Sequence, residues 1–325
     1  MTKFILWFLR AYRLAIRLRS ITGAVFLSRF LPNDTLTTKE KVQWSNGQLV
    51  LPRHNKKFQK PDLVVMHGSI DYIVKAASLY DLTSLGGRQM KVSTNRNGKK
   101  VDVRFQNFDG YYAFEEVFEE ELYDFNFQKQ FIVFDVGMNI GTASLFFSTF
   151  DNVKRIYSFE PFAETYQRAL GNFSLNEQLA RKISPFNCGL SHTDKEIEVP
   201  YSYDGSLGAS TSDFVITQQR PREAATTERV VLKRADTLIN KGLEDNPGCG
   251  IILKLDCEGA EYEILQDLSA TGTIDKISLC IIEWHFKGKE PLISLLEKAG
   301  FKTISPNRPD RDGKKEMGMI YAFKG

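Results

Sequence analysis

Acidic side chains and a histidine follow two apolar stretches in the C-terminal half of the chain. Asp256 and Glu258 come directly after one stretch, and His285 ends the next. A carboxylate or an imidazole can accept the proton of a hydroxyl nucleophile, and the unperturbed pKa of histidine, about 6.5, suits that task near neutral pH. Asp256, Glu258 and His285 are therefore the candidate catalytic residues. The alternative for His285 is a loop histidine with structural contacts only.

The charged neighbours of these residues have structural interpretations. Lys254 is expected to form an ion pair with a nearby acid, and Glu261 to cap the helix that it begins. Asp256, Glu258 and His285 could also hold a divalent metal that orients two hydroxyls. The sequence does not favour a required metal, and it assigns no metal ligands. The spacing of the four cysteines fits no CxxC zinc pattern.

A turn with two glycines follows an earlier apolar stretch, residues 131–136, and precedes a predicted helix. Gly137 and Gly141 allow a tight turn and a close approach of the backbone to a ligand, and the helix end offers free N–H groups. A nicotinamide cofactor favours the pattern G-x-G-x-x-G, but Asn139 stands where that pattern has its second glycine. The turn therefore indicates a nucleotide-like ligand other than a dinucleotide.

Two acids beside this turn narrow the choice of ligand. Asp135 would repel a pyrophosphate and would suit the positively charged amino and sulfonium groups of S-adenosylmethionine. Glu160 ends the next predicted strand, 19 residues after Gly141 (160 − 141), and an acid there can accept hydrogen bonds from both ribose hydroxyls. The alternative is a tight turn and an exposed glutamate without a ligand. The predicted cofactor-binding residues are Asp135, Gly137, Asn139, Gly141 and Glu160.

Strand-like and helix-like patterns alternate from residue 131 to the end of the chain. This alternation predicts an α/β fold, a mostly parallel sheet with helices on both faces, and ligands bind such sheets beyond the carboxyl ends of the strands. The acidic motifs fall at those ends. The expected strands are 131–136, 155–159, 183–190, 230–233, 251–256, 277–283, 301–304 and 317–323, and the expected helices 142–150, 163–175, 261–268 and 291–299, with a loop from 234 to 250.

Three parts are expected along the chain: residues 1–62, 63–130 and 131–325. The first contains a basic amphipathic helix and a linker with a hairpin at Asn46-Gly47. The second is a small β-rich region with strands at 63–66, 90–93 and 101–105, a hairpin at Asn97-Gly98 and a helix at 112–123. The third is the cofactor-binding domain. Within it, residues 205–213 form a small polar loop that is either a lid over the substrate or a solvated turn.

The first 32 residues are basic and apolar, with no acid before Asp34. Arg10, Arg13 and Arg17 fall on one face of a helix, which could lie on an anionic membrane surface. The alternatives are docking on the protein itself and a signal or anchor segment. No run of about 18 uncharged apolar residues predicts a membrane span. We expect a cytoplasmic protein with reduced thiols and a peripheral membrane contact through residues 1–32.

The overall composition limits the partners of the chain. A formal net charge of +3 over 325 residues is too small to indicate a nucleic-acid partner. A small molecule is therefore a more suitable partner than a nucleic acid, and the sequence does not determine an oligomeric state.

The motifs resemble those of the FkbM family of methyltransferases over residues 101–325. Cys257 and Trp284 stand where the family more often has valine and histidine, and the charged positions are unchanged. The resemblance implies a class I methyltransferase (Rossmann-like) fold with an antiparallel C-terminal strand and S-adenosylmethionine as methyl donor. It also implies O-methylation of a sugar hydroxyl in a glycan or glycosylated metabolite. The resemblance rests on FEEVFEEELYD at 114–124, DVGMNIG at 135–141, FEPFAETYQRALGNFSLN at 159–176, LKLDCEGAEYEIL at 253–265 and IIEWH at 281–285.

Other functions remain open on the same fold class, because a fold alone does not determine a reaction. One is methylation of a non-sugar small molecule or a lipid-linked acceptor. A second is a nucleotide-dependent oxidoreductase, and a third is a non-catalytic binding module. The presence of Asp135, Glu160, Asp256 and Glu258 argues against the last.

Overall fold

The computed structural model describes residues 42–66, 70–126, 128–201, 210–212, 226–306 and 317–324. The predicted N-terminal helix, within residues 1–32, lies outside the described residues, as does most of the loop 205–213. Within the described ranges, no helix is long and apolar enough to cross a membrane. The chain divides into two compact units, residues 1–115 and 116–325.

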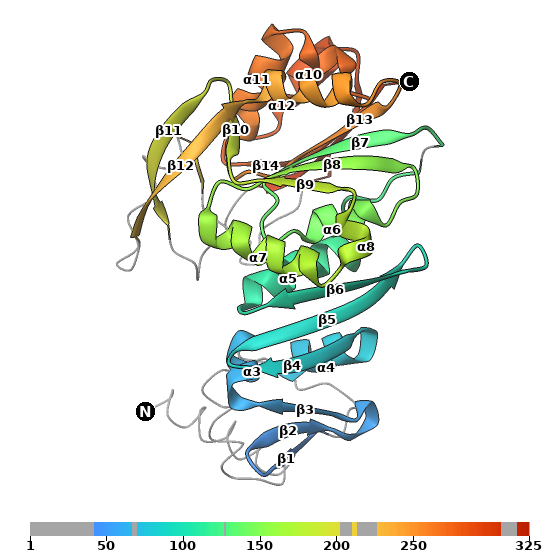
Figure 1. The fold of residues 1–325 in the computed structure, drawn as a ribbon, viewed down its shortest axis with the longest axis vertical. Coiled ribbons are helices and arrows are strands. Elements are labelled where there is room, and N and C mark those ends of the chain that lie inside the picture. The colour runs from blue at the N-terminus through green and yellow to red at the C-terminus, as the bar shows by residue number, and fades with distance from the viewer. Residues whose placement is uncertain are drawn as a thin grey trace. The chain divides into compact units, whose positions relative to one another are not determined.

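The first unit contains two small antiparallel sheets and short helices (Figure 1). Both predicted hairpins are confirmed: Asn46-Gly47 and Asn97-Gly98 have positive φ at each residue, as tight hairpin turns require. The elements are β1 (Gln43–Ser45), β2 (Gln48–Leu51), β3 (Lys56–Gln59), α3 (Lys60–Val65), α4 (Ile70–Leu79), β4 (Asp81–Gly86), β5 (Gln89–Arg96), β6 (Lys99–Phe105) and α5 (Phe108–Phe118), which continues into the second unit.

Some segments of this unit differ from the sequence-based expectation. Residues 63–66, predicted as a strand, belong to the end of helix α3. Pro61 occupies its first turn, and the Gln59 N–H donates to the Asp62 carboxylate at 2.7 Å, so local capping favours a helix over the strand. Helix α4 was not predicted, and the helix expected at 112–123 begins and ends earlier, as α5.

A seven-stranded sheet forms the centre of the second unit (Figure 1), in the order β15-β16-β14-β13-β7-β8-β9. Its parallel strands are β7 (Phe131–Val136), β8 (Val153–Phe159), β9 (Ile183–Phe186), β13 (Gly250–Leu255), β14 (Leu279–His285) and β15 (Lys302–Ile304). Strand β16 (Met317–Phe323) lies between β15 and β14, and among the described strands of this sheet it alone runs in the opposite direction. The expected sheet and its antiparallel C-terminal strand are confirmed.

Helices cover both faces of the sheet, which confirms the expected α/β fold. Figure 1 shows α10, α11 and α12 on one face and α6, α7 and α8 on the other. Strands β7 and β13 are buried along their whole length because they lie at the centre of the sheet. The helices are α6 (Thr142–Ser148), α7 (Ala163–Ser174), α8 (Glu177–Ala180), α10 (Ala235–Asp245), α11 (Glu261–Ala270) and α12 (Glu290–Lys298).

A three-stranded sheet, in the order β10-β12-β11, lies between β9 and α10 in the sequence. Its strands are β10 (Gly189–Ser191), β11 (Lys195–Tyr201) and β12 (Thr226–Arg234). The single strand predicted at 183–190 is wrong: it is two strands, β9 and β10, in different sheets. Asn187 lies between them and donates hydrogen bonds to the carbonyls of Glu160 and Pro161, where the chain leaves the large sheet.

The loop predicted before β13 is also wrong, because most of it forms helix α10. This helix buries Ala235, Ile239 and Gly242. These three residues form only a narrow apolar face, and one of them is glycine, so the sequence pattern of this helix is weak. Glycine is needed there, since a Cβ at position 242 would meet the ring of Phe134 at 2.6 Å.

The ends of β7 and β13 approach each other closely at Gly137. Its φ is +79°, and a Cβ at this position would overlap the carbonyl oxygen of Asp256. The Asp256 N–H donates to the carbonyl of Val136 at 3.1 Å. Glycine at 137 is therefore required by the contact between two motifs that are far apart in the sequence.

Gly137→Ala tests this contact, with Gly248→Ala as a matched control. Gly248 has φ +82°, but a Cβ there would have nothing within 4 Å, so its substitution isolates the backbone cost, about 1–2 kcal/mol. We expect Gly137→Ala to lower the free energy of unfolding by at least about 2 kcal/mol more, because overpacking adds to that cost. Urea unfolding measures both, and equal losses would contradict the steric explanation.

Candidate active site

The turn after β7 is tied to the end of β8 by backbone hydrogen bonds. The N–H groups of Gly137 and Met138 donate to the Phe159 carbonyl at 3.1 and 2.9 Å. Asn139, with φ +51°, donates its N–H to the Glu160 carboxylate at 2.9 Å. The glycine turn after β7 and Glu160 after β8 thus form one surface at the carboxyl ends of these neighbouring strands.

Glu160 is held at the edge of this surface by two backbone donors. Its other oxygen accepts the Phe162 N–H at 3.1 Å, and only 5% of the residue is exposed. Burial raises the pKa of Glu160 to about 7, although the N–H groups of Phe162 and Asn139 oppose the rise. Its ionisation is therefore poised near neutral pH.

A pocket of about 640 Å³, counting the space open to solvent, lies over this surface. Apolar side chains from Val136, Phe159, Phe162 and Leu190 form part of its wall. None of its lining residues, within the part of the chain that the structure describes, is lysine or arginine. Such a pocket suits a neutral or cationic ligand better than a pyrophosphate. Five of the predicted site residues line it: Gly137, Asn139, Glu160, Asp256 and Glu258.

Asp135 does not line the pocket. It is fully buried, its Oδ1 lies 3.1 Å from the Lys254 Nζ, and its Oδ2 accepts the Ser144 hydroxyl at 2.5 Å. This geometry differs from the expectation that Asp135 faces the positive charge of a ligand, because Lys254 already meets its charge. The pairing of Lys254 with a nearby acid agrees with the sequence-based expectation.

Gly141 is likewise absent from the pocket wall and has a packing role. Its φ is +87°, and a Cβ there would meet the Phe173 ring at 2.6 Å. Gly141 begins α6 and lets α7 pack closely on this turn.

Asp256 lies between the pocket and the end of β14. Its Oδ2 accepts the Tyr123 hydroxyl at 3.2 Å and lies 3.6 Å from the Lys254 Nζ. Burial and nearby carboxylates raise the pKa of Tyr123, so its hydroxyl remains a donor. With 29% of its side chain exposed, Asp256 is accessible to a ligand in the pocket. Sequence analysis missed Tyr123, whose role depends on a contact with a residue more than a hundred positions away.

His285 is buried beside several carboxylates. Its Nδ1 lies 3.3 Å from Glu261 Oε1, and its Nε2 lies 3.9 Å from Glu258 Oε1. Burial alone would lower the pKa of His285, but the carboxylates of Glu258, Glu261 and Glu283 raise it well above the ordinary value. These carboxylates favour the protonated imidazole. The setting of His285 therefore differs from the unperturbed pKa that the sequence analysis expected.

Glu261 positions this histidine and the preceding loop. Its carboxylate accepts the N–H groups of Gly259 and His285, each at 2.8 Å, and the residue is fully buried. The predicted capping role of Glu261 at the start of α11 agrees with the first of these bonds, and the second extends it to β14.

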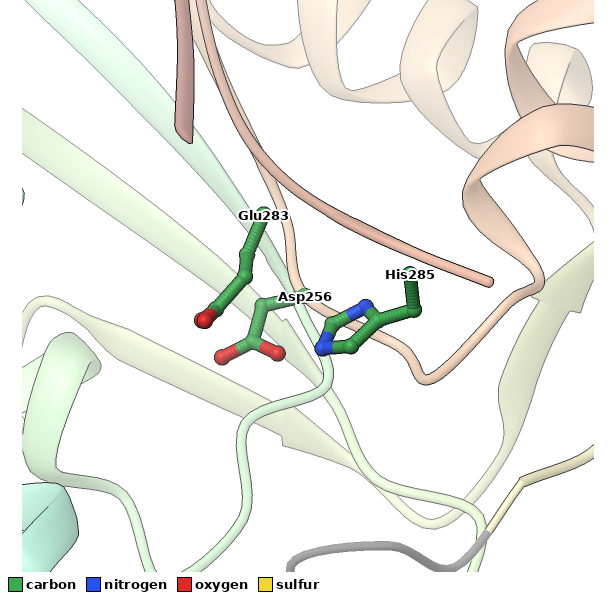
Figure 2. A group of neighbouring side chains, drawn as sticks. All are labelled: Asp256, Glu283 and His285. Carbon is green, nitrogen blue, oxygen red and sulfur yellow. The ribbon is translucent and has the colours of Figure 1, made fainter. Parts of the chain in front are cut away.

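Glu283 joins Asp256 and His285 at one point, as Figure 2 shows. Sequence analysis did not select Glu283 as a site residue. It precedes His285 by two positions on a strand, so their side chains share a face. That alternation is the signal that could have identified it.

Part of the loop 205–213 contributes to the site. Ser210, Thr211 and Ser212 are buried, and the Ser210 hydroxyl donates to the Glu258 carbonyl at 2.5 Å. Thr211 lines the pocket. For these three residues, the expectation of a solvated turn is wrong.

Comparisons with known proteins agree on one family. A family model described as the methyltransferase FkbM domain matches residues 135–303. Methyltransferase sdnD of Sordaria araneosa is 26% identical over 213 residues, which are 58% of this chain and 81% of that protein. The hexuronic acid methyltransferase AglP of Haloferax volcanii is 28% identical over 177 residues, 53% of this chain and 64% of that protein, slightly less than two thirds.

One solved structure that the comparison finds is the methyltransferase FkbM from Methylobacillus flagellatus. It has a TM-score of 0.41 and 14% identity, and the match covers 66% of this chain and 50% of that one.

Removing the cation between Asp135 and Lys254 tests their coupling. Lys254→Met leaves a buried carboxylate without its counter-charge, which should lower the free energy of unfolding by about 3–5 kcal/mol. The double variant Asp135→Asn/Lys254→Met should regain most of that loss. Lys233→Met is the control, since its pair with Asp194 is exposed and should contribute less than about 1 kcal/mol. Similar losses for Lys254→Met and Lys233→Met in urea unfolding would refute the coupling.

Proposed function

This chain belongs to the FkbM methyltransferase family, and we propose that it transfers the methyl group of S-adenosylmethionine to a hydroxyl of a sugar. One observation carries the proposal: Glu160 and Asp256 line the same pocket. Glu160 follows the carboxyl end of β8, and Asp256 follows the carboxyl end of β13. The sugar belongs to a glycan or a glycosylated metabolite in this proposal.

The lining of the pocket fits the proposed cofactor. Its apolar wall suits an adenine ring, and Glu160 offers carboxylate oxygens to ribose hydroxyls. The acidic lining, with Glu160, Asp256 and Glu258, suits a sulfonium. When bound, S-adenosylmethionine would supply the activated methyl group.

Asp256 is the residue best placed to act on the acceptor. Tyr123 and Lys254 both contact its Oδ2, which fixes the carboxylate and leaves Oδ1 toward a hydroxyl. Holding the hydroxyl in line with the methyl group supplies much of the rate of a displacement reaction. His285 would orient the Glu258 carboxylate, because its Nε2 lies 3.9 Å from Glu258 Oε1.

A sugar acceptor is supported by the polar surroundings of Asp256 and by one relative. Glu258 and Thr211 also line the pocket and can contact hydroxyl groups. AglP is named for a hexuronic acid acceptor. A non-sugar or lipid-linked acceptor would use the same carboxylate. The absence of cationic side chains among the described lining residues disfavours a dinucleotide oxidoreductase.

Cofactor affinity should depend on pH through Glu160. Its raised pKa, about 7, means that the free protein loses the carboxylate charge as pH falls through neutrality. Ribose hydroxyls and a cationic ligand favour the ionised form, so affinity should rise with pH and level off above about 8. Below the pKa it should fall up to about tenfold per pH unit. Calorimetry with S-adenosylmethionine measures this.

Glu160→Gln should weaken binding at pH 8 and remove the pH dependence. Glu164→Gln, an exposed glutamate on α7, is the matched control and should behave as the wild type. Absence of binding to the wild-type protein would overturn the cofactor assignment.

Asp256→Asn should slow methyl transfer by about 10²–10⁴-fold, the usual contribution of a positioned base. Cofactor affinity should change little, because Glu160 and the Gly137–Asn139 backbone are untouched. Transfer of a labelled methyl group to a panel of neutral and acidic sugars measures the rate. A normal rate in Asp256→Asn would exclude this residue from the reaction.

A further inference from the structure

Asp256, Glu283 and His285 each direct one potential metal-ligating atom to a common point. These atoms all lie within 4.8 Å of one another. The side chains come from the ends of the adjacent parallel strands β13 and β14, and Figure 2 shows them converging. The arrangement includes Glu283 in place of Glu258, the acid that the sequence suggested for a metal.

The carboxylate of Glu261 fixes the orientation of the His285 ring on its Nδ1 side. Glu261 Oε1 lies 3.3 Å from Nδ1 and also accepts the backbone N–H of His285 at 2.8 Å. A buried carboxylate that holds one imidazole nitrogen is the usual support of a metal-binding histidine, because it directs the other nitrogen to the ion.

That other nitrogen, Nε2, is directed toward Asp256 (Figure 2). Only 6% of His285 is exposed, and Nε2 has no hydrogen bond within the described residues. Its ion-pair distance to Glu258 Oε1 is 3.9 Å, longer than a hydrogen bond. This nitrogen can bind a cation when it carries no proton, so binding would release a proton from a protonated imidazole.

The local charge also favours a cation. Asp135 is matched by Lys254, and His285 contacts both Glu258 and Glu261, while Asp256 and Glu283 add two further carboxylates. Four carboxylates, those of Asp256, Glu258, Glu261 and Glu283, thus lie close to His285. Their negative charge would attract a cation.

We propose that Asp256, Glu283 and His285 bind a divalent cation of the Mn²⁺ or Mg²⁺ type. Carboxylates suit both ions, and the imidazole makes Mn²⁺ the better match. Asp256 would offer the ion one carboxylate oxygen, and Tyr123 and Lys254 hold this carboxylate in place through its Oδ2.

The ion would hold two neighbouring hydroxyls of the acceptor, and Asp256 would then act on the acceptor through it. This consequence rests on the proposed function, whereas binding of the ion does not. Glu258, whose Oε1 lies 3.9 Å from His285 Nε2, would be close to a water molecule or a hydroxyl held at this site.

Direct titration of the full chain with Mn²⁺ alone tests the site. The protein is first treated with a chelator, and free Mn²⁺ is counted by electron paramagnetic resonance. We expect saturable binding of one ion per chain, at least about tenfold weaker in Glu283→Gln and in His285→Ala. Glu261→Gln should weaken binding less, since it only supports the ring. Thermal unfolding confirms that each variant is folded, and the isosteric Glu283→Gln keeps the test informative if His285→Ala fails to fold.

His192→Ala is the matched control. His192 contacts Glu263 at 3.0 Å through Nδ1, as His285 contacts Glu261, but half of its side chain is exposed. This variant should bind Mn²⁺ as the wild type does. Absence of saturable binding to the wild type, or equal binding in Glu283→Gln and the wild type, would overturn the proposal.

Activity separates this proposal from the proposed function. Loss of methyl transfer after chelation, restored by Mn²⁺, would support both. Mn²⁺ binding without transfer to any sugar would leave the metal site standing and overturn the sugar acceptor. Full transfer by chelator-treated enzyme that binds no Mn²⁺ would overturn the metal site and leave the methyltransferase proposal intact.

Discussion

Lys254 is buried at the centre of the second unit, and protein groups meet its charge. The Asp135 carboxylate, the Gly137 and Val136 carbonyls and the Asp256 carboxylate surround its Nζ. Burial alone would lower the pKa of Lys254, but Asp135 and Asp256 raise it above its ordinary value, so the side chain stays charged. One cation thereby joins the end of β7 to the end of β13. The pocket and the position of the Asp256 carboxylate both depend on this junction.

The acids around this junction differ in role because their surroundings differ. Asp135 is neutralised and structural, and Glu261 is occupied by backbone N–H groups. Glu160 borders the pocket with its ionisation near neutral pH, and Asp256 keeps a partly exposed oxygen beside it. Similar side chains at successive strand ends thus differ: some are fully occupied by protein contacts, and others line the pocket. Burial and the number of hydrogen-bond donors decide which role each one has.

The sequence predicts those features that depend on local spacing. The limits of β7 and β16, the two hairpins and the place of Glu160 follow from periodicity and turn residues. Features that depend on contacts across the sheet do not follow. The partner of Asp135, the raised pKa of His285 and the role of Tyr123 each need the position of a distant strand or loop. Helix α10 was missed for a related reason. A glycine within a helix weakens the helical pattern, and Gly242 is needed only because the ring of Phe134, on β7, packs against it.

Strand β14, which carries Glu283 and His285, pairs on its outer edge with β16. Glu283 lies opposite Met319, and His285 opposite Met317, so the last strand of the sheet supports the far side of the site. During synthesis the ribosome must release residues 317–323 before this edge can close. Until then β14 presents unpaired backbone groups, a template for pairing with other chains. The order of translation therefore leaves the β14 side of the pocket to assemble after β16 emerges, and makes this edge a vulnerable surface of the nascent protein.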